Sequence, residues 1–277
     1  MLEPRYRWVL PETTAPDPAL LAAAAAHDLS PRVAGLLARR GVEGSDALAA
    51  FFGDPEAALH DPALLPDAES LRERIRRARR DSEGILVFGD FDADGLTGLA
   101  IVTSALRALG CDAEPYVPSR LEEGHGLSLR AVEAAVAAGR RLIVTVDTGT
   151  TSGSEIAAAA AAGVDVLVTD HHRVPPELPP AVAVVNAHRP DSRYPDRRLA
   201  GSGIAFKVAQ LLLADLPDGA ARALGLADLA AIGTVADVTP IVGENRAIAR
   251  LGLERLRRAP RPGIAALLAR AGIAPSA

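Results

Sequence analysis

The stretch that decides the fold is Ile85-Leu86-Val87-Phe88-Gly89-Asp90-Phe91-Asp92-Ala93-Asp94-Gly95. Its first four residues are large and apolar, which predicts a buried strand, and a helical pattern begins after Gly95. Asp90, Asp92 and Asp94 stand at alternate positions, so in an extended chain their carboxylates project from one face and repel one another. Divalent cations would relieve this repulsion. An acidic turn that caps the following helix would have the same residues, so this stretch leaves both interpretations open.

The chain after this stretch predicts the fold class. Short apolar runs alternate with helical patterns that end in glycine, which is typical of an α/β protein with a parallel sheet and helices on both faces. We expect strands at residues 85–88, 113–117, 142–146, 164–168 and 182–185. We expect helices at residues 96–109, 129–138, 154–162, 204–213, 226–235 and 244–257. Before the sheet, helical patterns at residues 18–27 and 31–40 predict a helical N-terminal arm, and a basic helix begins at residue 68.

Composition and charge narrow the class of protein. The chain has 277 residues, of which 49% are hydrophobic but only 3% aromatic, so its core must consist of Ala, Leu, Val and Ile. The formal net charge of -5 excludes a broadly basic surface for nucleic acid and allows only a local groove. Cys111 is the single cysteine, which excludes a disulfide framework and a cysteine-rich zinc site. No apolar run reaches the roughly 18 residues of a membrane span, so we expect a cytoplasmic protein.

Acidic residues follow three of the predicted strands. The first strand leads into the three alternate aspartates, the run 143–146 leads into Asp147, and the run 166–169 leads into Asp170-His171-His172. The carboxyl ends of parallel strands share one edge of a sheet, where ligands bind in open α/β folds, so we expect these residues to converge. Asp237 lies in the apolar segment 233–238, where an isolated charge would be costly. Separate caps and turns therefore become the weaker interpretation.

The residue types indicate the kind of metal. Several carboxylates with one or two imidazoles and no thiolate suit Mn²⁺ or Mg²⁺ better than structural zinc. So many anionic ligands would overcoordinate one ion, whereas two ions about 3.5–4 Å apart, bridged by one carboxylate, would suit attack at phosphorus. Asp147 stands alone at the end of its strand and is the natural bridge. His171 and His172 are adjacent, so we expect one to bind metal and the other to contact a phosphate or donate a proton.

A glycine-rich segment leads into a later helix. The sequence Ala200-Gly201-Ser202-Gly203-Ile204-Ala205-Phe206-Lys207 resembles half of a dinucleotide-binding fingerprint, but Phe206 occupies the third glycine position. Its backbone amides could hold a phosphate at the helix N-terminus, with Lys207 one turn further on. A loop that only caps the helix would look the same, so both interpretations stay open.

Together these motifs resemble the DHH phosphoesterase superfamily, and specifically the RecJ-type single-strand-specific exonucleases. The matching motifs, in order, are Gly-Asp-Phe-Asp-Ala-Asp-Gly at 89–95, Val-Thr-Val-Asp at 144–147, Val-Thr-Asp-His-His at 168–172, Gly-Ser-Gly-Ile-Ala-Phe-Lys at 201–207 and Gly-Thr-Val-Ala-Asp-Val at 233–238. Val117-Pro118-Ser119-Arg120 and Glu123-Gly124-His125-Gly126 are also similar, although Tyr is more usual at the place of His125. Trp8 and residues 47–52 fit as well, so the resemblance covers essentially the whole chain.

The resemblance implies a role for each matched residue. Two Mn²⁺ or Mg²⁺ ions would be held by Asp90, Asp92, Asp94, Asp147, His171 and Asp237, with Asp147 bridging and Asp90 either binding or supporting. His172 would contact the scissile phosphate and would be catalytic together with Asp147. Contacts to substrate phosphates would come from Arg120, Gly201, Ser202, Gly203 and Lys207.

The resemblance also implies an organisation and a function. Residues 1–67 would form the helical arm, 68–258 the DHH catalytic domain, and 259–277 the start of a helix that connects to a second domain absent from the chain. The implied function is that of a metal-dependent phosphodiesterase, a 5′-to-3′ exonuclease that releases 5′-mononucleotides from single-stranded DNA in DNA repair and recombination. Single-stranded DNA is the expected partner, with a single-strand-binding protein and a helicase as further candidates and no membrane. The alternatives are a DHH phosphodiesterase for short oligonucleotides or cyclic dinucleotides, and a catalytically silent replication scaffold.

Overall fold

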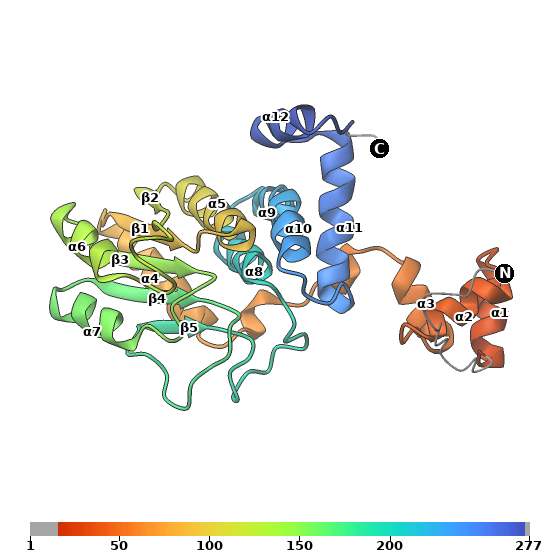
Figure 1. Ribbon diagram of the computed structural model, residues 1–277. Coiled ribbons are helices and arrows are strands. Elements are labelled where there is room, and N and C mark those ends of the chain that lie inside the picture. Colours follow the sequence, from red (N-terminus) through yellow and green to blue (C-terminus); the bar gives the residue numbers. More distant parts are fainter. Residues whose placement is uncertain (1–15, 275–277) are drawn as a thin grey trace, which may run out of the picture. The chain divides into compact units, whose positions relative to one another are not determined.

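The apolar run before the aspartates forms the central part of a sheet. In the computed structural model, which describes residues 16–274, strand β1 (Ile85–Gly89) has all of its residues buried. β1 belongs to a five-stranded parallel sheet with the order β2-β1-β3-β4-β5 (Figure 1). The other strands are β2 (Ala113–Tyr116), β3 (Leu142–Val146), β4 (Asp165–Thr169) and β5 (Ala183–Val185). The predicted α/β class is confirmed, and the strands lie within one or two residues of their predicted positions.

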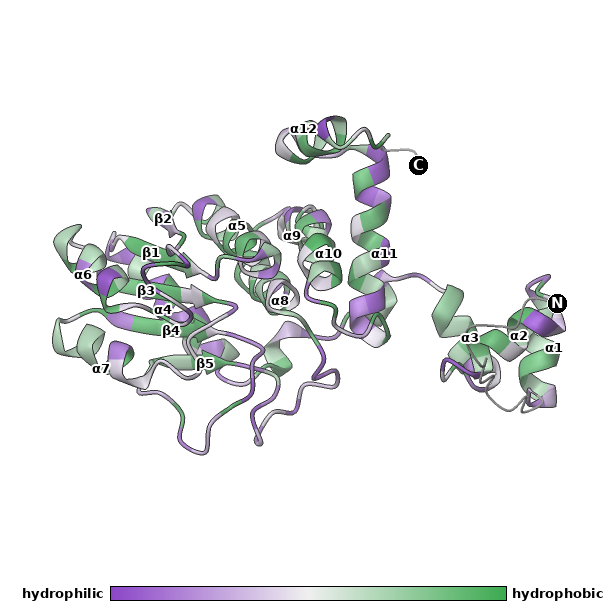
Figure 2. Ribbon diagram, viewed as in Figure 1, coloured by the Kyte–Doolittle hydropathy of each residue, from purple (hydrophilic) through white to green (hydrophobic). Residues whose placement is uncertain are grey.

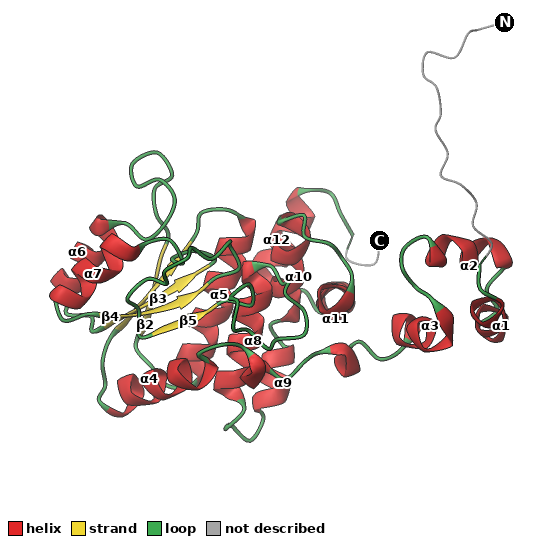
Figure 3. Cartoon of the chain, turned by 90° about the horizontal axis from the view of Figure 1, so that it is seen from below, coloured by secondary structure: helices red, strands yellow, loops and turns green. Residues whose placement is uncertain are grey.

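Helices cover both faces of this sheet, as Figure 3 shows. Alternate residues of a strand point to opposite faces, so Ile85 and Val87 of β1 face one helical layer, while Leu86 and Phe88 face the other. One layer consists of α6 (Leu129–Ala137) and α7 (Gly153–Ala161). The other consists of α4 (Ala68–Arg80), α5 (Ala93–Ala108) and α8 (Gly201–Leu213). The predicted arrangement of helices on both faces is therefore confirmed.

A further group of helices packs on the outer side of α5 and α8. It consists of α9 (Gly219–Leu224), α10 (Ala227–Ala236) and α11 (Gly243–Arg258), and the short α9 was not expected from the sequence. α12 (Pro262–Arg270) follows and has no buried residue. The stretch Gly219–Ala236 has the length and apolar composition of a membrane span, but 56% of it is buried inside the structure. Because a buried core helix passes the same test, this stretch is weak support for a span.

The apolar residues follow this layered arrangement. Figure 2 shows hydrophobic residues along the central strands and on the neighbouring helices, and hydrophilic residues on several of the long loops. The first half of α11 contributes buried residues to the packing, whereas its last turns are largely exposed. The apolar composition inferred from the sequence is therefore concentrated between the sheet and its two helical layers.

The N-terminal helices form a compact unit of their own. This unit extends to Ala57, and the rest of the chain from Ala58 forms the second unit. Helices α1 (Pro18–Ala26), α2 (Pro31–Ala38) and α3 (Gly44–Phe52) pack around buried apolar residues, namely Leu20, Ala24, Ala34, Leu37, Val42 and Leu48. α3 is a regular helix in residues that the sequence placed within the predicted helical arm. Residues 1–15, which include Trp8 and the start of the predicted arm, and residues 275–277 lie outside the described part of the chain.

Residues 58–67 belong to the second unit and pack within it. The carbonyl oxygen of His60 accepts a hydrogen bond from Lys207 of α8 at 2.6 Å. The carboxylate of Asp67 accepts hydrogen bonds from the backbone N–H of Val184 and from the guanidinium of Arg189. The compact units therefore divide ahead of residue 67, where the sequence had suggested the boundary.

The strand order determines where a ligand can bind. The chain leaves β1 toward β2 on one side, whereas β3, β4 and β5 follow on the other side. The loops after β1 and β3 therefore run in opposite directions and leave a crevice at the carboxyl edge of these two neighbouring strands. The acidic motifs follow β1, β3 and β4, so the topology places them around this crevice.

Close packing of α11 on α10 gives a testable prediction for the fold. A methyl group at Gly252 would overlap Ala231 and the carbonyl oxygen of Ala227, whereas a methyl group at Gly263 of α12 would meet nothing within 4 Å. Gly252→Ala should therefore lower the free energy of unfolding by about 1–3 kcal/mol through overpacking. The matched change Gly263→Ala should leave it unchanged or raise it by up to about 1 kcal/mol, because Ala favours helix. Chemical denaturation followed by circular dichroism measures both; equal effects would contradict the packing.

Candidate metal centre

The aspartates that follow β1, β3 and β4 occupy equivalent positions at the sheet edge. The backbone N–H of Asp90 donates to the carbonyl oxygen of Val146, that of Asp147 to Thr169, and that of Asp170 to Val185. Each aspartate thus takes the next position of the hydrogen-bonded ladder after the last residue of its strand. The expected convergence of the strand ends follows from this register.

The three aspartates of the opening stretch have different environments. Extended chain ends at Asp92, which caps α5 by accepting the N–H of Gly95 at 2.9 Å. Asp94 already lies in the first turn of α5, so the expectation that all three side chains share one face of an extended chain is wrong. Gly95 permits this early turn, because a side chain there would come within 2.5 Å of the carbonyl oxygen of Asp90. The helix consequently starts directly behind the acidic residues.

The carboxylate of Asp94 is held by the N-terminus of α8. Asp94 is 1% exposed, and it accepts hydrogen bonds from the backbone N–H groups of Gly201 at 2.6 Å and Ser202 at 2.9 Å. The positive end of a helix dipole stabilises such an anion. The nest that the sequence suggested therefore exists, but its anion is Asp94. Gly201, Ser202 and Gly203 are buried, and the amides of Gly201 and Ser202 have Asp94 as their partner, so the structure gives no support to the prediction that these residues bind a substrate phosphate.

Asp147 lies at the centre of the acidic cluster and is 2% exposed. Its φ of +61° is in the left-handed region, which non-glycine residues rarely adopt and which is frequent at functional sites. Burial raises the pKa of Asp147 to about 7; the charge of Asp94 contributes to this rise, and the hydrogen bond with His171 opposes it. A carboxylate in this position is therefore short of positive charge.

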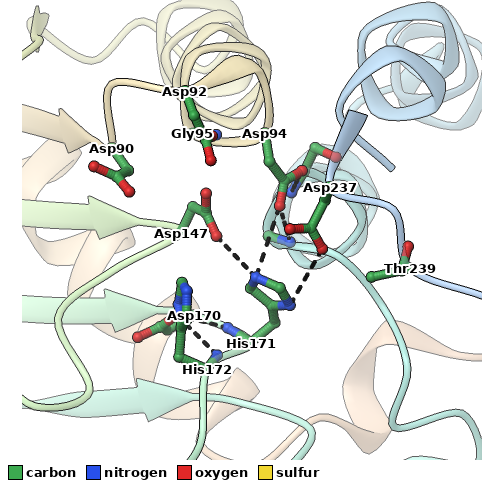
Figure 4. A network of polar contacts seen from close by, with 12 residues as sticks. Asp90, Asp92, Asp94, Gly95, Asp147, Asp170, His171, His172, Asp237 and Thr239 are labelled. Atoms are coloured by element: carbon green, nitrogen blue, oxygen red, sulfur yellow. Dashed lines mark hydrogen bonds and ion pairs between the residues drawn. The ribbon is translucent and has the colours of Figure 1, made fainter. Parts of the chain in front are cut away.

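His171 is surrounded by three carboxylates (Figure 4). Its Nε2 lies 3.1 Å from Asp147 and 3.8 Å from Asp94, and its Nδ1 lies 3.9 Å from Asp237. Asp237 follows the last residue of α10 and approaches from the helical side of the site. Burial raises the pKa of Asp237, and the charges of Asp94 and Asp92 add to this effect while His171 opposes it.

His172 has a different partner. Its Nδ1 lies 2.7 Å from Asp170, a carboxylate that is 1% exposed, whereas the His172 side chain is 57% exposed. This hydrogen bond raises the pKa of His172 to about 9. Burial acts to raise the pKa of Asp170, but the hydrogen bond and charge of His172 outweigh it and lower that pKa to about 2. His172 therefore presents an oriented, positively charged ring to the solvent side of the site.

Sequence reasoning missed the residues that support His172. Asp170 also accepts the backbone N–H groups of His171, His172 and Thr150. Asn186, which is fully buried after β5, donates to the hydroxyl of Thr150 and to the carbonyl oxygen of His172. Asp170 could have been found, because a carboxylate directly before two functional histidines commonly orients one of them. Nothing in the sequence pattern indicates Asn186.

Among the described residues, the six predicted metal ligands fall into two groups. Asp90, Asp92 and Asp147 form one, and Asp94, His171 and Asp237 form the other; within each group the ligand atoms lie within 4.8 Å of one another. Ligand atoms of Asp147, His171 and His172 also lie within this distance of one another. The side chains of the two adjacent histidines therefore diverge less than we expected. Asp147 belongs to the first group and lies 3.1 Å from His171 of the second, where a bridging ligand would be. The oxygen-rich donor set of each group fits a hard divalent cation.

Arg120 lies at the exposed rim of the site. Its guanidinium stacks 4.8 Å above the ring of Phe91, and the ring of His125 lies 4.8 Å from the same Phe91. His125 also approaches Asp90, with Nδ1 3.8 Å from a carboxylate oxygen. A cavity of about 560 Å³ continues from here along α7, lined by residues that include Asp90, His125, Asp147, Thr148, Ser152, His172 and Arg173. Arg120 is therefore accessible to a phosphate, as the sequence suggested.

Lys207 is not accessible to a phosphate. Its side chain is fully buried, and its ammonium lies 2.9 Å from the buried carboxylate of Glu244 and 2.6 Å from the carbonyl oxygen of His60. The prediction that Lys207 contacts substrate is wrong, because the residue points away from the site into the protein interior. The sequence showed the residue and its helix but not the partner at position 244.

Comparison with known proteins agrees with this geometry. Residues 84–234 match the model of the DHH family, N-terminal domain. The single-stranded-DNA-specific exonuclease RecJ of Bacillus subtilis (strain 168) is 41% identical over 244 residues, which cover 88% of this chain and 30% of that protein. The chain thus spans about a third of the length of this relative.

Solved structures show the same similarity. The crystal structure of RecJ from Thermus thermophilus in complex with Mn²⁺ matches with a TM-score of 0.73 and 31% identity, over 95% of this chain and 37% of that one. The structure of RecJ from the same organism in complex with Mg²⁺ matches with a TM-score of 0.65 and 29% identity, over 95% of this chain and 34% of that one. The family match includes β1 to β5 and the acidic motifs at their carboxyl ends. The chain therefore belongs to the DHH family, and within it resembles the RecJ exonucleases.

Proposed function

We propose that the chain is the catalytic portion of a divalent-metal-dependent phosphodiesterase that acts as a 5′-to-3′ exonuclease on single-stranded DNA and releases 5′-mononucleotides. The observation that carries the proposal is the pair of ligand groups on either side of Asp147 at the edge of β1 and β3. Paired divalent sites of this kind are typical of enzymes that hydrolyse phosphodiesters. The similarity to proteins named as single-stranded-DNA-specific exonucleases supports the choice of substrate.

The donor set fits two Mn²⁺ or Mg²⁺ ions. We propose that Asp90, Asp92 and Asp147 hold one ion and that Asp94, His171 and Asp237 hold the other, with Asp147 shared. The raised pKa values of Asp147 and Asp237 support this assignment, because both carboxylates lack compensating positive charge. When bound, such ions would stabilise the negative charge that develops on the phosphoryl oxygens.

The chain's own residues would bind and orient the substrate. His172 lines the cavity beside Asp147, and its hydrogen bond to Asp170 fixes the ring so that Nε2 can donate to a phosphate oxygen. Arg120 can contact a second phosphate from the rim, where its guanidinium is already aligned by Phe91. These two positive groups would guide an anionic strand into an otherwise acidic site.

The cellular setting belongs to the same proposal. We propose a cytoplasmic protein that acts on single-stranded DNA in repair and recombination, with a single-strand-binding protein and a helicase as candidate partners. The net charge of -5 supports a substrate groove of limited size, because a large basic surface is not available.

The substrate assignment can be tested with labelled nucleic acids and Mn²⁺. A 5′-labelled single strand should be degraded to mononucleotides, whereas a blunt duplex should be cut at least roughly tenfold more slowly, because stacked and paired ends cannot enter the cavity. Faster hydrolysis of dinucleotides than of long strands would instead indicate a phosphodiesterase for short oligonucleotides. Loss of Mn²⁺ to EDTA should abolish the activity.

Asp147→Asn is the variant that tests the metal centre. Asn keeps the shape of the side chain and tolerates the positive φ at this position, but it removes the shared negative charge. Hydrolysis should fall roughly 100-fold or more, while circular dichroism should show an intact fold. An active Asp147→Asn protein would exclude the shared carboxylate.

Gly201 should be essential for the position of Asp147. A methyl group at Gly201 would overlap a carboxylate oxygen of Asp147 and lie 2.6 Å from its Cβ, whereas one at Gly203 would make only ordinary contacts, the nearest at 3.4 Å. Gly201→Ala should weaken Mn²⁺ binding roughly 10- to 100-fold, and Gly203→Ala should leave it within about twofold. Isothermal titration calorimetry measures both, and equal affinities would contradict the close approach.

Stability without metal should depend on pH through Asp147. Its pKa is raised to about 7 in the folded chain, so ionisation of this group removes stability as the pH rises through that value. In EDTA, Asp147→Asn should therefore be more stable than the unmodified chain at pH 8, and the difference should shrink as the pH falls toward 5. Thermal melts across this range measure it.

A further inference from the structure

A fully buried ion pair lies behind the candidate metal centre. The ammonium of Lys207 in α8 and the carboxylate of Glu244 in α11 are 2.9 Å apart, and both side chains are 0% exposed. Glu244 also accepts hydrogen bonds from the backbone N–H of His60 at 3.0 Å and from the hydroxyl of Tyr194 at 2.7 Å. Burying two charges is costly unless their geometry and hydrogen bonds are nearly complete, as they are here.

This pair fixes the point at which the chain enters α11. The backbone N–H of Glu244 donates to Asp196 at 3.1 Å, so the residue is held through both its side chain and its main chain. The neighbouring Asn245 donates to the carbonyl oxygens of Arg198 at 2.6 Å and of Pro240 at 3.2 Å. The start of α11 is therefore tied to α8, to the segment around residue 196 and to the loop that precedes it.

The loop before α11 carries Asp237 at its beginning. Val238, Ile241 and Val242 in this loop are 85%, 40% and 37% exposed, so the loop has little apolar packing of its own. Val238 has a φ of +62°, which is strained for a β-branched residue and must be imposed by the surrounding structure. The position of the loop is therefore set chiefly at its ends, where α10 stops and α11 starts.

Asp237 itself has little that would fix its carboxylate. Asp94 is held by two backbone amides, whereas the carboxylate of Asp237 accepts no hydrogen bond from the described residues and lies 3.9 Å from Nδ1 of His171. Its placement therefore depends on the backbone that carries it. Lys207 belongs to α8, whose N-terminus holds Asp94, and Glu244 belongs to α11, which follows the loop that begins at Asp237. The ion pair therefore links the helix that holds one member of this ligand group to the helix that anchors the loop of another.

We propose that Lys207 and Glu244 are positioning residues that set the distance of Asp237 from Asp94 and His171, and thereby the affinity of this group for a divalent cation. This inference rests on the proposed metal centre. It also gives Lys207 a role within the glycine-rich motif: the start of the motif holds Asp94, and its end anchors the helix that follows Asp237. Rupture of the pair should release the loop and weaken one metal site while the other site keeps its ligands.

The test measures Mn²⁺ binding by calorimetry in the absence of DNA, at a temperature well below the melting point of each variant. Lys207→Met alone leaves a buried carboxylate unpaired, so Lys207→Met with Glu244→Gln is the main variant, because it removes both charges at similar volume. Tyr194→Phe, which removes one hydrogen bond to Glu244, is a milder second variant. We expect the unmodified chain to bind two ions and the main variant to lose roughly tenfold or more in affinity at one of them.

Two controls separate positioning from general loss of stability. Gly252→Ala perturbs the packing of the same helix α11 and should lower stability without changing Mn²⁺ affinity. When Asp237→Asn is already present, the two substitutions of the main variant should lower Mn²⁺ affinity by less than about a further twofold, because position 237 then has no carboxylate to be positioned.

The outcomes distinguish the inference from the proposed function. Wild-type affinity in a folded main variant, or an equal loss in the Asp237→Asn background, would overturn the positioning role while leaving the metal centre intact. An unmodified chain that binds no Mn²⁺ would instead overturn the proposed metal centre, and the positioning role with it.

Discussion

Mutual repulsion of carboxylates at one edge of the sheet is the constraint on which the structure depends. Asp90 and Asp147 are placed there by the register of the strands, and Asp94 and Asp237 approach from two helices. The protein supplies part of the compensating charge itself, through the N-terminus of α8 and the ring of His171. The remaining deficit of positive charge, visible in the raised pKa values of Asp147 and Asp237, is what the proposed divalent cations would offset.

Much of the fold could be predicted because its signals are local. Apolar runs and the glycines at helix ends predicted the five strands and most helices. Because the carboxyl ends of parallel strands share one edge of the sheet, the strand-end aspartates could then be expected to lie close together. The errors in the predicted phosphate contacts concern interactions between distant residues. The partner of Lys207 is Glu244 and the partner of the Gly201 amide is Asp94, and neither pairing is visible in a periodic pattern. Both residues were therefore predicted to bind a substrate phosphate, which is the partner that the glycine-rich motif suggests when its tertiary contacts are unknown.

The two adjacent histidines show that local sequence and tertiary contacts both determine the surroundings of a side chain. Their order in the chain gives them opposite surroundings: His171 turns toward the carboxylates and His172 toward the cavity. Asp170 makes this division stable, because it binds the backbone of both residues and the ring of only one. The sequence could show that the two roles differ, but it gave no sign of Asn186, which lies after β5 and binds the carbonyl oxygen of His172.

The left-handed backbone of Asp147 has a consequence for the history of such chains. Only glycine, asparagine and aspartate adopt this conformation readily, so most substitutions at the position would damage the sheet edge as well as the charge. Few single substitutions at this position would remove the negative charge and still keep the fold, and asparagine is the one closest in shape to aspartate. Inactive relatives that arise by drift should therefore carry asparagine or glycine here far more often than any other residue.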